Sequence, residues 1–125
     1  MTPEELLRAL AGFTGSDTLT RHGLTRRVLM SKGVVFLAEQ AQAHWLTDLI
    51  VAHQVDPRVR FEPFQVWTLT VDAATRSAVA TMTDGNSKLP VTQQEIPWTD
   101  FPLPEVTLWL VQEGELWIML LPGEY

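Results

Sequence analysis

The sequence contains no cysteine, and this absence excludes disulfide bonds, thiol nucleophiles and thiolate metal sites. Nor does it contain an apolar run approaching the ~20 residues that a membrane-spanning helix needs. Its first ten residues, MTPEELLRAL, begin with acids where a signal peptide would carry bases. Because small secreted domains usually contain disulfides, these absences predict a cytoplasmic protein that does not act in a membrane.

Basic residues are also scarce, since 9 Lys and Arg stand against 15 Asp and Glu, for a formal net charge of −6. Nucleic-acid affinity rests on neutralising phosphates, so we expect no direct binding of DNA or RNA. The basic residues form two groups in the sequence. The simpler interpretation is that both groups lie on a solvated surface, and the alternative is that they bind a phosphate or an acidic partner. These groups are Arg21, Arg26, Arg27 and Lys32, and then Arg58 and Arg60.

The chain of 125 residues, 46% of them hydrophobic, is sufficient for a single domain with one core, which we place at residues 1–125. Thr2 followed by Pro3 and two glutamates is typical of a helix start and predicts a short helix over residues 3–11. A second, longer helix is predicted from about Lys32 to His53, because its apolar residues recur at i, i+3, i+4 and i+7. We expect its Trp45 and Leu49 to be buried on a sheet.

After residue 63 the apolar period changes from that of a helix to that of a strand. Residues 13–20 are rich in turn formers, and 25–30 read as one short strand. The remaining predicted strands are 64–72, 76–84, 91–96, 106–112 and 115–121. We therefore predict an α+β fold, with N-terminal helices packed on one face of an antiparallel meander sheet of about four to six strands.

The last predicted hairpin is apolar on both faces, whereas a sheet with one solvated face should alternate apolar and polar residues. Something must cover the second face: the proline-rich segment 98–104, the N-terminal helix, or another chain. If nothing within the chain covers it, self-association is expected. Trp109 and Trp117 lie on its two strands, where they could stack across the hairpin, facing either the long helix or an interface.

Residues 96–105, IPWTDFPLPE, contain three prolines yet carry large apolar side chains. Prolines limit regular structure here and reduce the entropy lost on ordering. We predict a rigid strap (residues 98–104) in which Phe101 and Leu103 point into the core. Asp100 is expected to accept backbone hydrogen bonds, and Trp98 to be partly exposed.

No catalytic or metal signature stands out, and we expect neither a cofactor nor a metal ion. His44 and Asp48 lie one helical turn apart, which suits either a structural pair or a histidine oriented as a general base. Should the fold form a ligand cleft between helix and sheet, its candidate residues are His22, His44, Asp48, Asp100 and Tyr125.

Short motifs spread over nearly the whole chain resemble those of an uncharacterised family of short bacterial and phage proteins, catalogued as a domain of unknown function. The most specific is the tryptophan-containing stretch that ends in TDFPL. The resemblance implies no activity, but it implies a role outside core metabolism. The motifs are FTG (13–15), RH (21–22), GVxFLAE (33–39), HWLxDLI (44–50), FQVW (64–67), QEIxWTDFPL (94–103) and PxEY (122–125).

Two function classes remain open at this stage. The favoured hypothesis is a non-enzymatic interaction protein of a phage or mobile element, which binds a protein partner or itself through Trp98, Trp109 and Trp117. A narrower version is an inhibitor of a host defence complex, such as an anti-CRISPR protein, whose acidic charge competes with nucleic acid for a basic surface. The alternative is a small enzyme or ligand-binding protein that uses the His/Asp-lined cleft.

Overall fold

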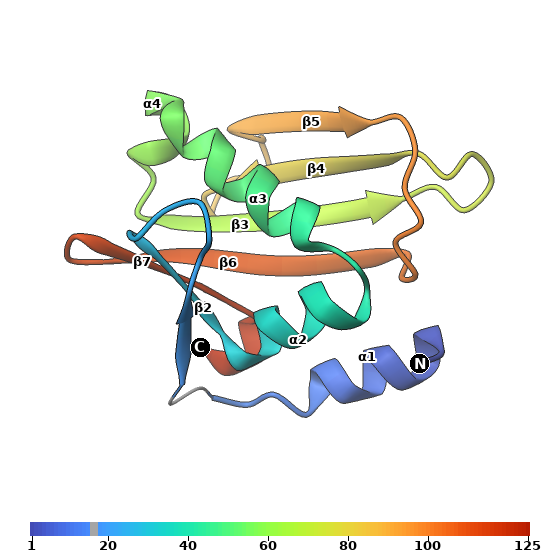
Figure 1. Ribbon diagram of the computed structural model, residues 1–125. Helices are drawn as coiled ribbons and strands as arrows, with labels where there is room; N and C mark the ends of the chain where they lie inside the picture. Colours follow the sequence, from blue (N-terminus) through green and yellow to red (C-terminus); the bar gives the residue numbers. More distant parts are fainter. Residues whose placement is uncertain (16–17) are drawn as a thin grey trace.

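The alternating segments after residue 63 form the centre of a sheet that also includes strands from the N-terminal part of the chain (Figure 1). The computed structural model describes residues 1–15 and 18–125. Within these ranges one seven-stranded sheet has the order β1-β2-β7-β6-β3-β4-β5. Its strands are β1 (Leu19–Arg21), β2 (Val28–Ser31), β3 (Phe64–Val71), β4 (Ala78–Thr83), β5 (Thr92–Ile96), β6 (Glu105–Glu113) and β7 (Leu116–Leu120).

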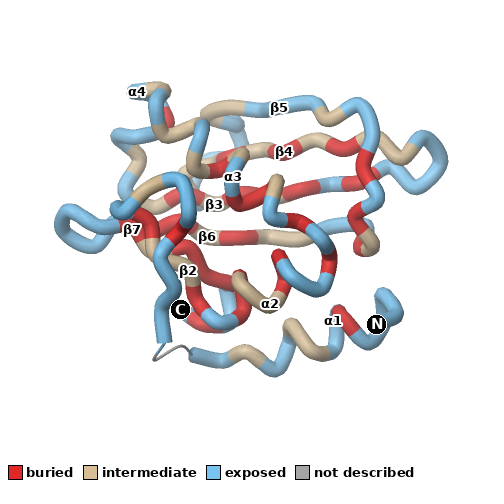
Figure 2. The backbone as a smooth tube through the Cα atoms, in the orientation of Figure 1, coloured by how far each residue is buried: buried red, intermediate tan, exposed pale blue. Residues whose placement is uncertain are grey.

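The helices lie on one face of this sheet, with α3 in front of β3 and β4 and α2 against β2 and β7 (Figure 1). Buried residues are concentrated along the central strands, whereas β5 and α1 are largely exposed (Figure 2). The α+β prediction with helices on one face is therefore confirmed. The helices are α1 (Pro3–Ala11), α2 (Lys32–Gln40), α3 (His44–Ala52) and α4 (Pro57–Arg60), with 3₁₀ turns η1 (His53–Val55) and η2 (Pro122–Glu124).

The sheet is slightly larger than predicted because β1 forms in the segment that was expected to consist of turns. This strand has three exposed residues, so it carries no alternation that a sequence could reveal. It pairs with β2, which in turn runs parallel to β7, while the other neighbouring strands are antiparallel. Two residues of the expected turn segment, Ser16 and Asp17, lie outside the described residues.

The single helix predicted from Lys32 to His53 is wrong, because the chain forms two helices there. Gln42 adopts a left-handed conformation with φ 52°, and the Ala43 N–H donates to the Ala38 carbonyl at 2.9 Å. This is the hydrogen-bond pattern of a helix that ends in a Schellman motif, where glycine is the usual residue. The Gln42 side chain also donates to the Glu39 carbonyl at 3.0 Å, which satisfies an acceptor at the helix end.

The break changes which residues of α3 face the sheet. Leu46, Thr47 and Ile50 are buried, whereas Trp45 and Leu49 are only half-buried at the edge of the core. The prediction that Trp45 and Leu49 would be buried on the sheet is therefore wrong. Three non-helical residues, 41–43, separate the end of α2 from the start of α3 and reset the helical phase, so a pattern counted through the break selects the wrong face.

The proline-rich strap is ordered and packed as predicted. Phe101 is fully buried and Leu103 is 3% exposed. The prediction that Asp100 accepts backbone hydrogen bonds is wrong, because Asp100 is exposed and the Phe101 N–H donates instead to the Thr99 Oγ1 at 3.1 Å. The Arg76 side chain donates to two strap carbonyls, those of Thr99 at 3.1 Å and Phe101 at 2.7 Å.

Trp109 and Trp117 point to opposite faces of the sheet, so the predicted stack between them is wrong. Trp117 pairs with Gln112 across the hairpin, and its ring lies on the helix side. On the other face Trp109 contacts Phe64 and Tyr125, with ring centroids 5.0 Å and 5.4 Å away. The C-terminal residue thus contributes to an aromatic cluster on the second face, and self-association stays a prediction.

Candidate functional site

His22 and Asp48 are brought together, although sequence spacing had suggested a pair between His44 and Asp48. His22 is 5% exposed, and its Nε2 lies 3.0 Å from the Asp48 Oδ1. Its Nδ1 accepts the Leu24 N–H at 3.0 Å. Both ring nitrogens are therefore engaged within the chain, and the pair fastens the β1–β2 loop to α3.

The other candidate cleft residues do not join this pair. His44 is exposed at the start of α3, and Asp100 is exposed on the strap. Tyr125 lies in the aromatic cluster on the face opposite the helices. Of the five residues suggested for a ligand cleft, His22 and Asp48 are thus paired, whereas the other three lie outside this pair.

The three tryptophans suggested for partner binding are also dispersed. Trp98 is 65% exposed on the strap, as expected for an amphipathic ring. Trp109 is half-buried on the face that the helices leave open. Trp117 is largely buried, but its ring lines a groove at the opposite end of the sheet from the strap.

This groove is lined by residues from three segments: the β1–β2 loop, the end of α4 with the residue that follows it, and the β6–β7 hairpin. All three segments lie at the same end of the sheet (Figure 1). We call it the arginine groove, after the cations that the fold collects there from both basic groups of the sequence. Glu115 is the one acidic residue among its lining residues. The principal lining residues are Arg26, Arg27, Arg60, Phe61, Leu116 and Trp117.

The guanidinium groups of the groove have few partners inside the protein. Within residues 1–15 and 18–125, Arg26, Arg27 and Arg60 form no ion pair. Arg60 makes one long hydrogen bond to the Val55 carbonyl at 3.5 Å and lies 5.3 Å from the Phe61 ring centroid. Their donors are therefore largely available to an external acceptor.

Apolar side chains beside these cations are unusually exposed. Phe61 is 76% exposed and Leu116 is 42% exposed. Arginine and aromatic residues are enriched at the energetic centres of protein interfaces. A groove that combines both, with exposed apolar area that folding leaves in water, has the composition of a recognition surface.

Backbone hydrogen bonds hold the three segments of the groove in place. The Trp117 N–H donates to the Arg27 carbonyl at 2.7 Å, which joins the hairpin to the β1–β2 loop. The Gln112 N–H donates to the Pro63 carbonyl at 2.8 Å, which joins the hairpin to the connection after α4. The groove therefore rests on a preorganised frame.

A buried glutamine holds α4 and the residues directly after it in place. Gln65 is fully buried, and its amide nitrogen lies 2.9 Å from the Val59 carbonyl and 3.1 Å from the Glu62 carbonyl. It also forms a reciprocal amide pair with Gln54 at 2.9 Å in both directions. The Trp67 indole donates to its carbonyl oxygen at 2.9 Å. Since Gln65 and Trp67 belong to the FQVW motif, that motif positions the segment carrying Arg60 and Phe61.

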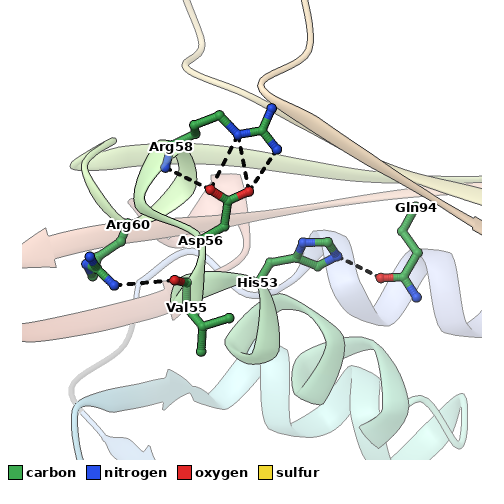
Figure 3. A network of polar contacts seen from close by, with 6 residues as sticks. All are labelled: His53, Val55, Asp56, Arg58, Arg60 and Gln94. Carbon is green, nitrogen blue, oxygen red and sulfur yellow. Dashed lines mark hydrogen bonds and ion pairs between the residues drawn. The ribbon is translucent and has the colours of Figure 1, made fainter.

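Polar contacts near α4 complete this frame (Figure 3). Asp56 accepts the Arg58 N–H at 2.9 Å and the Arg58 Nη2 at 2.8 Å, so it both caps α4 and engages that guanidinium. Hydrogen bonding from the Arg58 side chain, and then from its backbone, holds the pKa of Asp56 below its ordinary value. The His53 Nε2 lies 2.7 Å from the Gln94 Oε1, which links η1 to the edge strand β5.

A buried carboxylate at the C-terminus also has a structural role. Glu124 accepts the Ser31 hydroxyl at 2.5 Å and the Gly33 N–H at 3.1 Å, at the start of α2. A Cβ atom on Gly33 would lie 2.6 Å from the Glu124 Oε1, so this close approach requires glycine. The PxEY motif therefore fastens the end of the chain to α2.

Sequence reasoning identified the two basic groups but not that they converge, because the fold alone brings residues 26–27 beside residue 60. Phe61 was not identified as a candidate at all. In the described part of the chain, no group of histidine and acidic residues is arranged to hold a metal ion. Among the helices that the structure describes, none has the length and apolar character needed to cross a bilayer.

The chain belongs to a family of unknown function, DUF6876, whose sequence model matches residues 4–125. This match confirms the resemblance to a domain of unknown function that the motifs indicated. No curated protein and no solved structure matches the chain.

Proposed function

We propose that this chain is a non-enzymatic protein-binding module, that the arginine groove is its binding surface, and that its ligand is an acidic segment of a partner protein. One observation carries the proposal. Arg27 and Arg60, which are far apart in the sequence, line one groove beside the exposed Phe61, and neither forms an ion pair with an acid among the described residues. An acidic segment would supply the missing acceptors, and charge-assisted hydrogen bonds are among the strongest available.

A protein ligand fits the charge of the whole molecule better than nucleic acid does. The net charge of −6 opposes the approach of an extended polyphosphate. A short acidic segment has to enter only the local field of the groove, where arginines predominate. The net charge alone had suggested a basic partner, whereas the local distribution at the groove favours an acidic one.

The geometry gives less support to the enzyme hypothesis. A general base needs a nitrogen or oxygen free to take a proton from a substrate. Both nitrogens of His22 are engaged, and the other cleft candidates lie elsewhere. The narrower hypothesis of an inhibitor of a host defence complex, in a phage or mobile element, stays a prediction.

The proposal is tested by titrating ¹⁵N-labelled protein with the peptide Gly-Glu-Glu-Ser-Glu-Glu-Gly, here called the serine peptide, at low salt. We expect amide shifts concentrated at residues 25–27, 60–61 and 115–117, which weaken as salt is added because the attraction is screened. The double variant Arg27→Glu/Arg60→Glu should lose them. The control Arg8→Glu/Lys88→Glu, which changes the net charge equally at exposed sites elsewhere, should retain them.

Two outcomes would overturn the proposal. One is the absence of shifts at the groove in the native protein. The other is equal or tighter binding of a short oligothymidylate of matched charge, which would indicate a nucleic-acid site instead.

A further inference from the structure

A second hollow, of about 320 Å³, adjoins the arginine groove and shares Arg27, Arg60 and Trp117 with it. This volume is at the lower end of the range for pockets that hold ligands. Its remaining lining residues come mainly from β2, α3 and η1, and most of them are apolar. We call it the valine hollow, after Val28, Val51 and Val55.

The walls of the valine hollow suit an apolar group. Val28 is buried, Val51 is half-buried, and Val55 is 80% exposed at the rim. An apolar group placed here would remove from water the apolar surface that folding leaves exposed, which is favourable in proportion to its area.

The neutral polar side chains of the hollow are engaged elsewhere. The Gln54 amide donates to the Ile50 carbonyl at 3.0 Å and exchanges hydrogen bonds with Gln65. The Thr25 hydroxyl accepts the Arg27 N–H at 3.2 Å. Most of the unused hydrogen-bond donors at the hollow therefore belong to the guanidinium groups of Arg27 and Arg60, at its border with the groove, where Arg60 makes one long bond to the Val55 carbonyl.

We infer that the ligand of this site is a two-part segment, in which a branched aliphatic side chain enters the valine hollow while a neighbouring carboxylate binds Arg27 and Arg60. This inference rests on the proposed function and specifies its ligand. Because the same two arginines border both hollows, a carboxylate held there lies beside an aliphatic side chain in the hollow. Charge then supplies attraction and the hollow supplies selectivity among acidic segments.

The test compares the serine peptide with Gly-Glu-Glu-Leu-Glu-Glu-Gly, the leucine peptide, which has the same charge. Burial of a leucine side chain is expected to tighten binding about ten-fold or more. Val55→Ser removes exposed apolar surface from the rim, so it should reduce the advantage of leucine by about three-fold while affecting the serine peptide little. Leu89→Ser, at a side chain that is 78% exposed on another loop, is the matched control and should change neither affinity.

The possible outcomes distinguish this inference from the proposed function on which it rests. Equal binding of both peptides at the groove would overturn the two-part ligand and leave the acidic-segment proposal standing. Binding of neither peptide would overturn the proposed function itself. Equally tight binding of the neutral peptide Gly-Gln-Gln-Leu-Gln-Gln-Gly would overturn the role assigned to the carboxylate.

Discussion

The Arg76 guanidinium, at the strap end of the sheet, has two close backbone acceptors, whereas the Arg60 guanidinium, at the groove end, has one acceptor among the described residues, at 3.5 Å. The Arg76 guanidinium donates to the carbonyls of Thr99 and Phe101, and its own carbonyl accepts the Thr99 N–H at 2.8 Å. Arg60 instead lies over the exposed Phe61 ring. One arginine substitutes for the regular backbone pairing that prolines prevent, and the other remains available for recognition.

The same contrast extends to the apolar residues at the two ends. On the strap, Phe101 is fully buried, whereas at the groove Phe61 is 76% exposed. A segment without regular structure can therefore be either a packed part of the core or a recognition surface. Burial and hydrogen-bond partners distinguish the two cases, while composition does not.

The largest expected loss of stability is at the strap. Changing Phe101 to Ala should lower the free energy of unfolding by about 3–5 kcal/mol, because it leaves a cavity in the core. Urea denaturation measures this loss. Trp98→Ala, on the same segment but at an exposed ring, should cost less than about 0.5 kcal/mol. Equal costs for the two variants would contradict the description of a packed strap.

A somewhat smaller loss of stability is expected at Gln65, beneath the groove. Gln65→Leu should destabilise the protein by about 1–3 kcal/mol, because it leaves the buried indole N–H of Trp67 without its acceptor. It should also increase the hydrogen exchange of the amides of residues 59–62, because the carbonyls of Val59 and Glu62 lose a donor. If hydrogen exchange of these residues is the same in the variant and the native protein, Gln65 does not hold this segment in place.

The comparison between the two arginines is sharpest when both are changed in the same way. Arg76→Met keeps the aliphatic stem and should cost about 1–2 kcal/mol, because two strap carbonyls lose their donors. Arg60→Met should cost less than about 0.5 kcal/mol, as is usual at a surface site. Thermal or urea unfolding compares them, and a larger cost at Arg60 would reverse the contrast drawn above.

The smallest effect concerns the one paired guanidinium near the groove. The Asp56 carboxyl should titrate below its ordinary pKa of 3.8, since the Arg58 side chain stabilises the charged form. A carboxyl whose pKa is lowered by folding contributes stability above its unfolded pKa and loses that contribution as the pH falls through the folded pKa. Carbon-detected NMR titration should show this pKa rise in Arg58→Met. If the pKa is the same in both proteins, the ion pair is absent in solution.

Sequence reasoning succeeded where local spacing determines structure. Phe101 and Leu103 lie two residues apart, so they could be assigned to one side of an extended segment. The alternation of apolar and polar residues over 64–72 likewise predicted the strand β3. The capping signal at Thr2 also corresponds to the start of α1.

Sequence reasoning failed where a residue takes a structural role that its residue type does not indicate. Gln42 ends a helix in the conformation that glycine usually supplies, so no stop signal was visible. His22 pairs with Asp48 across the fold, whereas spacing had favoured His44. The groove was unpredictable for the same reason, because Arg27 and Arg60 become neighbours only through the hairpin packed between their segments.

The most direct test of the central claim is a charge swap across the groove. Binding of the leucine peptide and of its lysine counterpart, Gly-Lys-Lys-Leu-Lys-Lys-Gly, is measured by calorimetry with the native protein and with Arg27→Glu/Arg60→Glu. If the guanidinium groups hold the carboxylates of the ligand, the native protein should bind the acidic peptide and the variant should bind the basic one. If both proteins bind the acidic peptide with the same affinity, these arginines do not form the binding surface.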